Sequence, residues 1–170
     1  MGPRRLTLLR HGQAESVDAC PEDFERVLTR RGIVEAEQIA ARLLHRRLVP
    51  DLVLASPAER AWSTAEILAK ACELEVSQLQ CERDLYLATP ETTWRLLAGR
   101  DESLRHILIC GHNPGLSQLA SRLGPRPERR SLPTGGLATA SWQHASWSSL
   151  QPETAASCEL DDPDSASDWR

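Results

Sequence analysis

Hydrophobic positions along the chain follow two spacings that alternate with each other. Short continuous apolar runs, typical of strands buried on both faces, occur at Arg4–Leu9, Leu52–Ala55 and His106–Cys110. Elsewhere, apolar residues recur every three or four positions, which is the spacing of a helix packed on one side. This second spacing predicts helices over residues 33–44, 61–72, 90–100 and 115–123. The alternation of strands and helices predicts an α/β domain around a mostly parallel sheet.

Local signals mark where several of these elements begin and end. Thr29 is expected to cap the first helix, and Pro90 occupies a first-turn position of the third. Residues 124–136 are rich in Pro, Arg and Gly and predict a loop. Leu137–Gln143 has a strand-like pattern, and Ala155–Leu160 predicts a weak last strand.

The chain length sets the number of domains. The 170 residues are enough for one domain but not comfortably for two. At this size a fold buries roughly 70% of the surface that the unfolded chain exposes, so no disulfide or metal is required for stability. We expect a single domain over residues 1–162. The acidic end, residues 163–170, is expected to be frayed.

Charge and apolar content argue against two classes of partner. Residues 144–170 hold six acidic side chains and one basic one, and the other 143 residues hold 19 basic and 18 acidic ones. A nearly neutral body does not predict nucleic-acid binding. No apolar run approaches the roughly 18 to 20 residues of a membrane span, and Leu6–Leu9 is too short for a secretory signal. The five cysteines form no C-x-x-C pair, which is typical of a reducing compartment, and we expect a cytoplasmic protein.

Two histidines and two arginines follow the three apolar runs at their carboxyl ends. The residues at these ends are Arg10, His11 and Gly12 after the first run, Ser56 and Arg60 after the second, and His112 and Asn113 after the third. The carboxyl ends of neighbouring parallel strands lie at one edge of a sheet, where α/β proteins bind their ligands. We therefore expect these side chains to converge in one crevice.

This set of side chains predicts an anion site that contains a nucleophile. The guanidinium fork of arginine fits phosphate oxygens, and helix N-termini after Pro57 and Pro114 add N–H groups. A neutral imidazole is a competent nucleophile toward phosphorus. A metal site is not expected, because no third ligand has suitable spacing and the arginines would repel a cation. The sequence contains neither a G-x-G-x-x-G nor a Walker-type loop, so it does not predict a nucleotide cofactor.

Segments along most of the chain resemble the histidine phosphatase superfamily, the phosphoglycerate mutase-like group. Leu8–Gly12 resembles the R-H-G signature of that superfamily, and Leu54–Ala65 is similar to its S-P-x-x-R-A-x-Q-T-A segment. Three further segments resemble the small SixA branch, the phosphohistidine phosphatases. They are Asp23–Gly32, Gly111–Leu116 and Pro133–Ala138.

The resemblance implies a fold and a set of roles. The implied fold is a three-layer α/β/α sandwich whose mostly parallel sheet has one antiparallel strand near an edge. His11 would be the nucleophile that becomes phosphorylated. The phosphate pocket would be completed by Arg10, Arg60 and His112, with Gly12 and Asn113 as further phosphate-binding residues. Val27 stands where the family usually has Pro, and Ser63 stands where it usually has Gln, both outside this set.

The general acid is the weakest part of this assignment. Larger members of the superfamily use an Asp or Glu to protonate the leaving oxygen, and Glu82 is the nearest candidate here. Glu15, Asp18 and Asp23 have no better claim from spacing. A phosphohistidine substrate relaxes the demand, because its leaving group is an imidazole with a reference pKa of about 6.5.

The expected function is metal-independent hydrolysis of a phosphoryl group through a phospho-His11 intermediate, without a cofactor. The expected partner is a histidine-phosphorylated phosphotransfer protein. The sequence does not indicate an oligomeric state, and a monomer is the default. Two alternatives stay open: a small-molecule phosphomonoesterase of the same superfamily, and a catalytically silent module that binds phosphoproteins.

Overall fold

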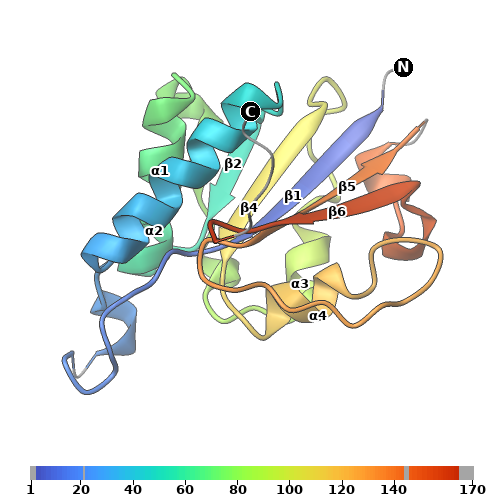
Figure 1. Ribbon diagram of the computed structural model, residues 1–170. Coiled ribbons are helices and arrows are strands. Elements are labelled where there is room, and N and C mark those ends of the chain that lie inside the picture. The colour runs from blue at the N-terminus through green and yellow to red at the C-terminus, as the bar shows by residue number, and fades with distance from the viewer. Residues whose placement is uncertain (1–2, 21, 144–145, 165–170) are drawn as a thin grey trace.

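The sheet has six strands in the spatial order β3-β2-β4-β1-β5-β6 (Figure 1). The structure, a computed structural model, describes residues 3–20, 22–143 and 146–164. The strands are β1 (Arg4–Arg10), β2 (Leu52–Ala55), β3 (Leu79–Cys81), β4 (His106–Gly111), β5 (Leu137–Trp142) and β6 (Ser157–Asp161). Strands β1 to β4 pair in parallel, whereas β5 runs antiparallel to β1 and to β6. The predicted mostly parallel sheet, with one antiparallel strand near an edge, is confirmed.

Helices cover both faces of this sheet (Figure 1). Helices α1 (Arg30–His45) and α2 (Glu59–Ala71) pack together on one face, and α3 (Pro90–Arg95) and α4 (Gly115–Ala120) lie on the other. Short 3₁₀ helices are η1 (Asp23–Glu25), η2 (Val76–Gln78), η3 (Arg83–Leu85), η4 (Trp147–Ser149) and η5 (Pro152–Thr154). The three-layer α/β/α sandwich is therefore confirmed.

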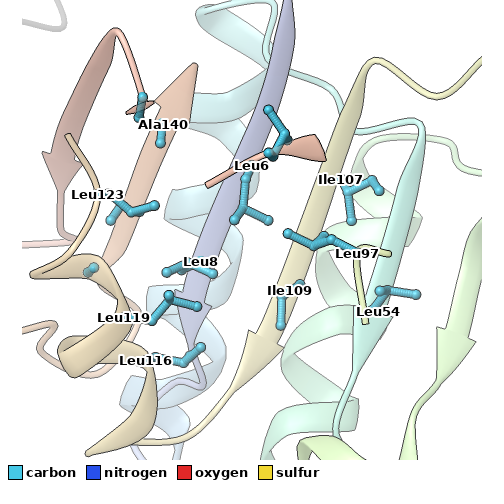
Figure 2. Packing of buried hydrophobic residues seen from close by; sticks show 14 of the residues in the cluster. Leu6, Leu8, Leu54, Leu97, Ile107, Ile109, Leu116, Leu119, Leu123 and Ala140 are labelled. Carbon is cyan, nitrogen blue, oxygen red and sulfur yellow. The ribbon is translucent and has the colours of Figure 1, made fainter. Parts of the chain in front are cut away.

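The central strands are buried on both faces, which explains their continuous apolar sequences. Leu6 and Leu8 of β1 point to the side of α4, where they belong to one cluster with Leu116 and Leu119 (Figure 2). Leu9, the next residue of β1, belongs to the second cluster, which forms between the sheet and helices α1 and α2. This tight packing on both sides leaves the strands little freedom to shift, and so their carboxyl ends are held at fixed positions.

Some elements differ from the sequence-based expectation. Helices α3 and α4 end at Arg95 and Ala120, earlier than predicted, because the chain continues from each into turns. Strand β3 was not predicted, because it has only three residues and all of them are partly or fully exposed. It adds to the edge of the sheet through its pairing with β2.

The segment after β6 packs against α1. Arg42 of α1 forms a buried ion pair with Asp161, and it donates a hydrogen bond from Nη2 to the carbonyl oxygen of Pro163 at 3.1 Å. Arg31 donates to Asp164 at 2.8 Å. The predicted frayed end begins at residue 163, and Pro163 and Asp164 make these contacts, whereas residues 165–170 lie outside the described part of the chain.

Among the helices of the described residues, none is both long enough and apolar enough to cross a membrane.

We predict that Arg42→Ala destabilises the protein by about 3 to 5 kcal/mol, because it removes the buried cation of the ion pair with Asp161. The free energy of unfolding is measured by urea denaturation. Arg46→Ala, at the residue that directly follows the same helix, is the matched control. The Arg46 side chain is 41% exposed and lies 3.7 Å from Asp161, so its loss is expected to cost less than 1 kcal/mol. Equal losses in the two variants would contradict the prediction.

Candidate active site

A pocket of about 350 Å³ lies at the carboxyl ends of β1, β2 and β4. The parallel pairing aligns Arg10 of β1 with Gly111 of β4, and Ala55 of β2 with Cys110 of β4, so the segments that follow the three strands meet here. The lining residues are Arg10, His11, Gln13, Ala14, Asp23, Arg26, Arg60, Leu87, His112, Asn113 and Thr134. The structure thus brings together the two histidines and two arginines that the strand ends predicted.

His11 presents one unprotonated ring nitrogen to this pocket. Its Nδ1 lies 2.7 Å from the carbonyl oxygen of Gly12, which can only accept, so Nδ1 carries the proton. Its Nε2 therefore accepts, and its partner is the Nε–H of Arg60 at 3.2 Å. Burial, together with the nearby charges of Arg60 and Arg10, lowers the pKa of His11 to about 4 although the Gly12 hydrogen bond opposes this. The ring is neutral at physiological pH and suited to nucleophilic attack.

Gly12 is needed for a close approach between the segment after β1 and the first turn of α1. A Cβ atom at this position would lie 2.4 Å from the carbonyl oxygen of Gly32 in the first turn of α1. The backbone N–H of Gly12 donates to Thr64 of α2 at 3.0 Å. Gly12 thus orients the carbonyl group that holds His11, while its own N–H is directed to α2. Because this N–H is already bonded to Thr64, it does not make the phosphate contact that was expected of Gly12.

Arg60, in the first turn of α2, is almost completely buried and is held on several sides. Besides its bond to His11, its Nη1 donates to the carbonyl oxygen of Asp23 at 2.5 Å, and its Nη2 donates to the Asp23 carboxylate at 3.0 Å. Nη2 also lies 3.3 Å from Nδ1 of His112. The guanidinium therefore connects both histidines with η1.

His112, directly after β4, faces His11 with 5.2 Å between the ring centroids. Because its Nδ1 accepts from Arg60, its proton resides on Nε2, which donates to Ser56 Oγ at 2.7 Å. Burial, followed by electrostatic interactions with the His11 ring and with the charge of Arg60, lowers its pKa to about 3. His112 is thus a second neutral imidazole, and the buried Ser56 hydroxyl orients it.

Arg10 and Asn113 share an anchor in the loop before β5. Nη1 of Arg10 donates to the carbonyl oxygen of Leu132 at 3.0 Å, and Nδ2 of Asn113 donates to the same oxygen at 2.9 Å. Asn113 Oδ1 accepts from the hydroxyl of Ser117, so its amide is occupied at both ends. Arg10 Nε is buried and has no hydrogen-bond partner among the described residues. Burial lowers the pKa of Arg10, although the nearby Glu35 opposes this.

Arg26 and Tyr86 were missed by the sequence analysis as functional residues, and Asp23 was considered there only as one of several possible general acids. Asp23 and Arg26 line the pocket, and Tyr86 donates a hydrogen bond to Asp23 at 2.8 Å. Arg26 binds Asp23 Oδ1 through Nε at 3.0 Å and Nη2 at 2.7 Å. The available signal was the D-F-x-R segment, which was used only for its family resemblance.

Glu82 lies outside this group. Its Oε1 accepts from Nη2 of Arg100 at 2.6 Å, and it does not line the pocket. Among the described residues, Asp23 is the only carboxylate that lines the pocket. Burial alone would raise the pKa of Asp23, but hydrogen bonds from Tyr86, Arg26 and Arg60 hold the pKa well below its usual value. The carboxyl group that lines the pocket is therefore ionised and acts as an acceptor.

Within the described part of the chain, no group of three or more His, Cys, Asp or Glu side chains could hold a metal ion. The chemistry that this geometry offers is anion binding by arginines beside a neutral imidazole nucleophile.

Comparisons with known proteins agree with this geometry. The sequence model of the histidine phosphatase superfamily (branch 1) matches residues 6–88. A protein of Agrobacterium tumefaciens assigned as the phosphohistidine phosphatase SixA is 30% identical, with 82% of this chain and 92% of that chain covered and a TM-score of 0.72. The chain therefore belongs to the histidine phosphatase superfamily.

Two further solved structures resemble this chain. The protein histidine phosphatase SixA complexed with tungstate is 26% identical, with 80% of this chain and 86% of that chain covered and a TM-score of 0.71. A protein of Nakamurella assigned as phosphohistidine phosphatase SixA shares the fold at 21% identity, with 97% and 99% covered and a TM-score of 0.78. A search of curated proteins found no match.

We predict that the stability of the protein falls as the pH is lowered from 7 to 5. The folded-state pKa is about 4 for His11, about 3 for His112 and about 4 for His106, a buried residue of β4 whose pKa is lowered first by burial. In the unfolded chain, histidines take up protons near pH 6.5, so only that state binds them between pH 6.5 and 4. Between pH 7 and pH 5, each histidine is expected to remove about 1 to 2 kcal/mol of stability.

Urea denaturation at pH 7, 6 and 5 measures this change in the free energy of unfolding. His106→Gln is expected to reduce the dependence on pH, since it removes one of the three groups. A stability that stays constant from pH 7 to pH 5 would show that these histidines are not held neutral in the folded state.

Proposed function

We propose that this protein is a phosphatase that works through a phosphorylated histidine, with His11 as the nucleophile. The observation that supports the proposal most directly is the unprotonated Nε2 of His11 inside a pocket lined by three arginines. A phosphoryl group carries two negative charges, and buried guanidinium groups are its natural partners. A module that only bound phosphoproteins would need the arginines but would not need the oriented nucleophile.

In the first step, Nε2 of His11 attacks phosphorus while the bond between phosphorus and the leaving nitrogen or oxygen breaks. The leaving group takes the bonding electron pair and then a proton from solvent. The Nε–H of Arg60 loses its acceptor on His11 as the new bond forms, so it can turn to a phosphoryl oxygen. The positive charge that develops on the His11 ring is stabilised by the carbonyl oxygen of Gly12 at Nδ1.

In the second step, water attacks the phosphorus atom of phospho-His11. The bond to Nε2 breaks and its electron pair returns to the ring, the proton of the water is lost to solvent, and inorganic phosphate leaves. Arg10, Arg60 and Arg26 are positioned to balance the charge that spreads over the phosphoryl oxygens in both steps. His112 lies beside them, and a change of its tautomer would allow Nδ1 to donate to the same oxygens.

The proposed substrate is phosphohistidine on a histidine-phosphorylated phosphotransfer protein. The SixA proteins among the similar structures support this choice, as does the ionisation of Asp23, which has no proton to give to a leaving alkoxide. An imidazole leaves without strong assistance, since its reference pKa is about 6.5. The competing candidate is a small-molecule phosphomonoesterase, which would need a proton donor that reaches the leaving oxygen.

We predict that His11→Ala abolishes turnover, because it deletes the covalent intermediate and does not merely weaken one contact. Phosphate release from a phosphohistidine protein is the measurement, with circular dichroism to show that the variant is folded. Incubation of the wild-type protein with ³²P-labelled substrate should also give an acid-labile label, which the variant lacks.

Two arginine variants test whether the buried guanidinium next to His11 contributes to the rate. Arg60→Ala is expected to lose at least 10²-fold in rate, since its fork is directed at the phosphoryl group, whereas the exposed Arg129→Ala is expected to change the rate less than twofold. Near-normal turnover in a folded His11→Ala protein would refute the proposal.

We predict that phosphohistidine and activated aryl phosphates are hydrolysed faster than alkyl esters such as phosphoserine. The reason is the lack of a carboxylic acid proton donor among the described lining residues. Because Glu82 pairs with Arg100 outside the pocket, Glu82→Gln is expected to change all rates less than threefold. A general acid would contribute about 10² to 10⁴ to ester hydrolysis.

Initial rates on matched phosphohistidine, aryl phosphate and alkyl phosphate substrates measure this preference. If an alkyl ester is the best substrate and Glu82→Gln cripples its hydrolysis, the phosphomonoesterase function replaces the one proposed here.

A further inference from the structure

Asp23 places a carboxylate among the cations of the pocket. Its Oδ1 accepts two hydrogen bonds from Arg26, at 3.0 and 2.7 Å, and its Oδ2 accepts from Arg60 at 3.0 Å and from Tyr86 at 2.8 Å. The residue belongs to η1, which follows the loop after β1. A carboxylate with four donors around it occupies the kind of position that a phosphoryl group would take among arginines.

Arg60 has few donors left in this arrangement. A guanidinium has five N–H bonds. One is directed to Nε2 of His11, one to Nδ1 of His112, and two to Asp23, through its backbone carbonyl oxygen and its carboxylate. A phosphoryl group can therefore gain more than one bond from Arg60 only if an existing partner is released. The Asp23 carboxylate is the partner that shares the negative charge of the incoming group.

The net charge of the lining residues also depends on Asp23. Arg10, Arg26 and Arg60 contribute three positive charges, and the two lining histidines are neutral. Asp23 contributes the single negative charge among the described lining residues, which leaves an excess of two positive charges. This excess matches one phosphoryl dianion. A neutral residue in place of Asp23 would leave an excess of three positive charges.

We propose that Asp23 is an internal anion that sets the affinity of the pocket for the phosphoryl group: it holds Arg60 and Arg26 while the pocket is empty and gives up Arg60 when the phosphoryl group binds. The proposal rests on the function proposed above, and it makes Asp23 a residue that limits how tightly product phosphate is retained. Arg26 stays with Asp23 through its two bonds to Oδ1, so η1 remains attached to the site after Arg60 changes partner.

Two opposing effects decide what happens when the charge of Asp23 is removed. The loss of a hydrogen bond to Arg60 would weaken the positioning of the guanidinium. However, Arg60 keeps its bonds to His11, to His112 and to the backbone carbonyl of Asp23, and its side chain is 2% exposed. The repulsion between the carboxylate and a bound dianion is lost at the same time. The Asp23 side chain is 38% exposed, so solvent screens part of this repulsion, but at such short range it still exceeds the positioning effect.

The test is the dissociation constant of inorganic phosphate and of vanadate, measured by calorimetry without any turnover. Asp23→Asn, which keeps the shape of the side chain, is expected to bind both anions about 10-fold more tightly than the wild type. Asp18→Asn is the matched control, since it removes one negative charge from an exposed position in the same loop. The control is expected to change the dissociation constants less than twofold. The KM for phosphohistidine should fall in Asp23→Asn together with the inhibition constant for phosphate.

Equal or weaker anion binding by a folded Asp23→Asn protein would overturn the inference, and so would an equal gain in Asp18→Asn. If the wild type bound neither phosphate nor vanadate, the proposed function itself would fail, which is a distinguishable result. A crystal structure of the wild type with vanadate tests the same point without a variant. Arg60 Nη2 should then contact a vanadate oxygen and no longer contact Asp23 Oδ2, and an unchanged Arg60–Asp23 pair would refute the exchange.

Discussion

The hydrogen bond from His11 Nδ1 to the carbonyl oxygen of Gly12 is the interaction on which the site depends. It determines which ring nitrogen carries the proton, and so which one offers an electron pair to the pocket. The carbonyl group can take this orientation because Gly12 packs directly on the backbone of Gly32, where no Cβ would fit. The first turn of α1 and the end of β1 are thereby fitted to each other, and the nucleophile is oriented by the backbone at that contact.

The arginines around His11 impose the next constraint, since buried guanidinium groups need acceptors. The protein supplies them from two separate segments, one between β1 and α1 and one before β5. The carbonyl oxygen of Leu132 receives Arg10, and Asp23 receives both Arg26 and Arg60. Each arginine is held in place before any anion binds, which reduces the ordering that binding would otherwise require. The same arrangement keeps both histidines neutral, because nearby positive charge and burial act in the same direction on their pKa values.

The membership of this chain in the histidine phosphatase superfamily is consistent with the way its site is divided among elements. The residues expected to contact phosphate come from strand ends and the first turn of α2, which are held by the two cores. Other lining residues, among them Asp23, Arg26 and Leu87, come from η1 and from irregular segments next to 3₁₀ helices. Rigid elements hold the reacting groups and the irregular segments modify the charge and shape around them, a division common in α/β proteins.

The sequence predicted the residues on rigid elements better than the residues in irregular segments. The apolar runs predicted β1, β2 and β4, and because parallel strands end at one edge, they also predicted that His11, Arg60 and His112 would meet. Strand β3 and the placement of Glu82 could not be predicted, because neither has a repeating apolar pattern and each depends on a distant partner. The Asp23 contacts to Arg60 and Tyr86 join residues 37 and 63 positions apart. Local sequence determines secondary structure and strand ends through burial and periodicity, whereas a hydrogen bond between two irregular segments exists only after the whole chain has packed.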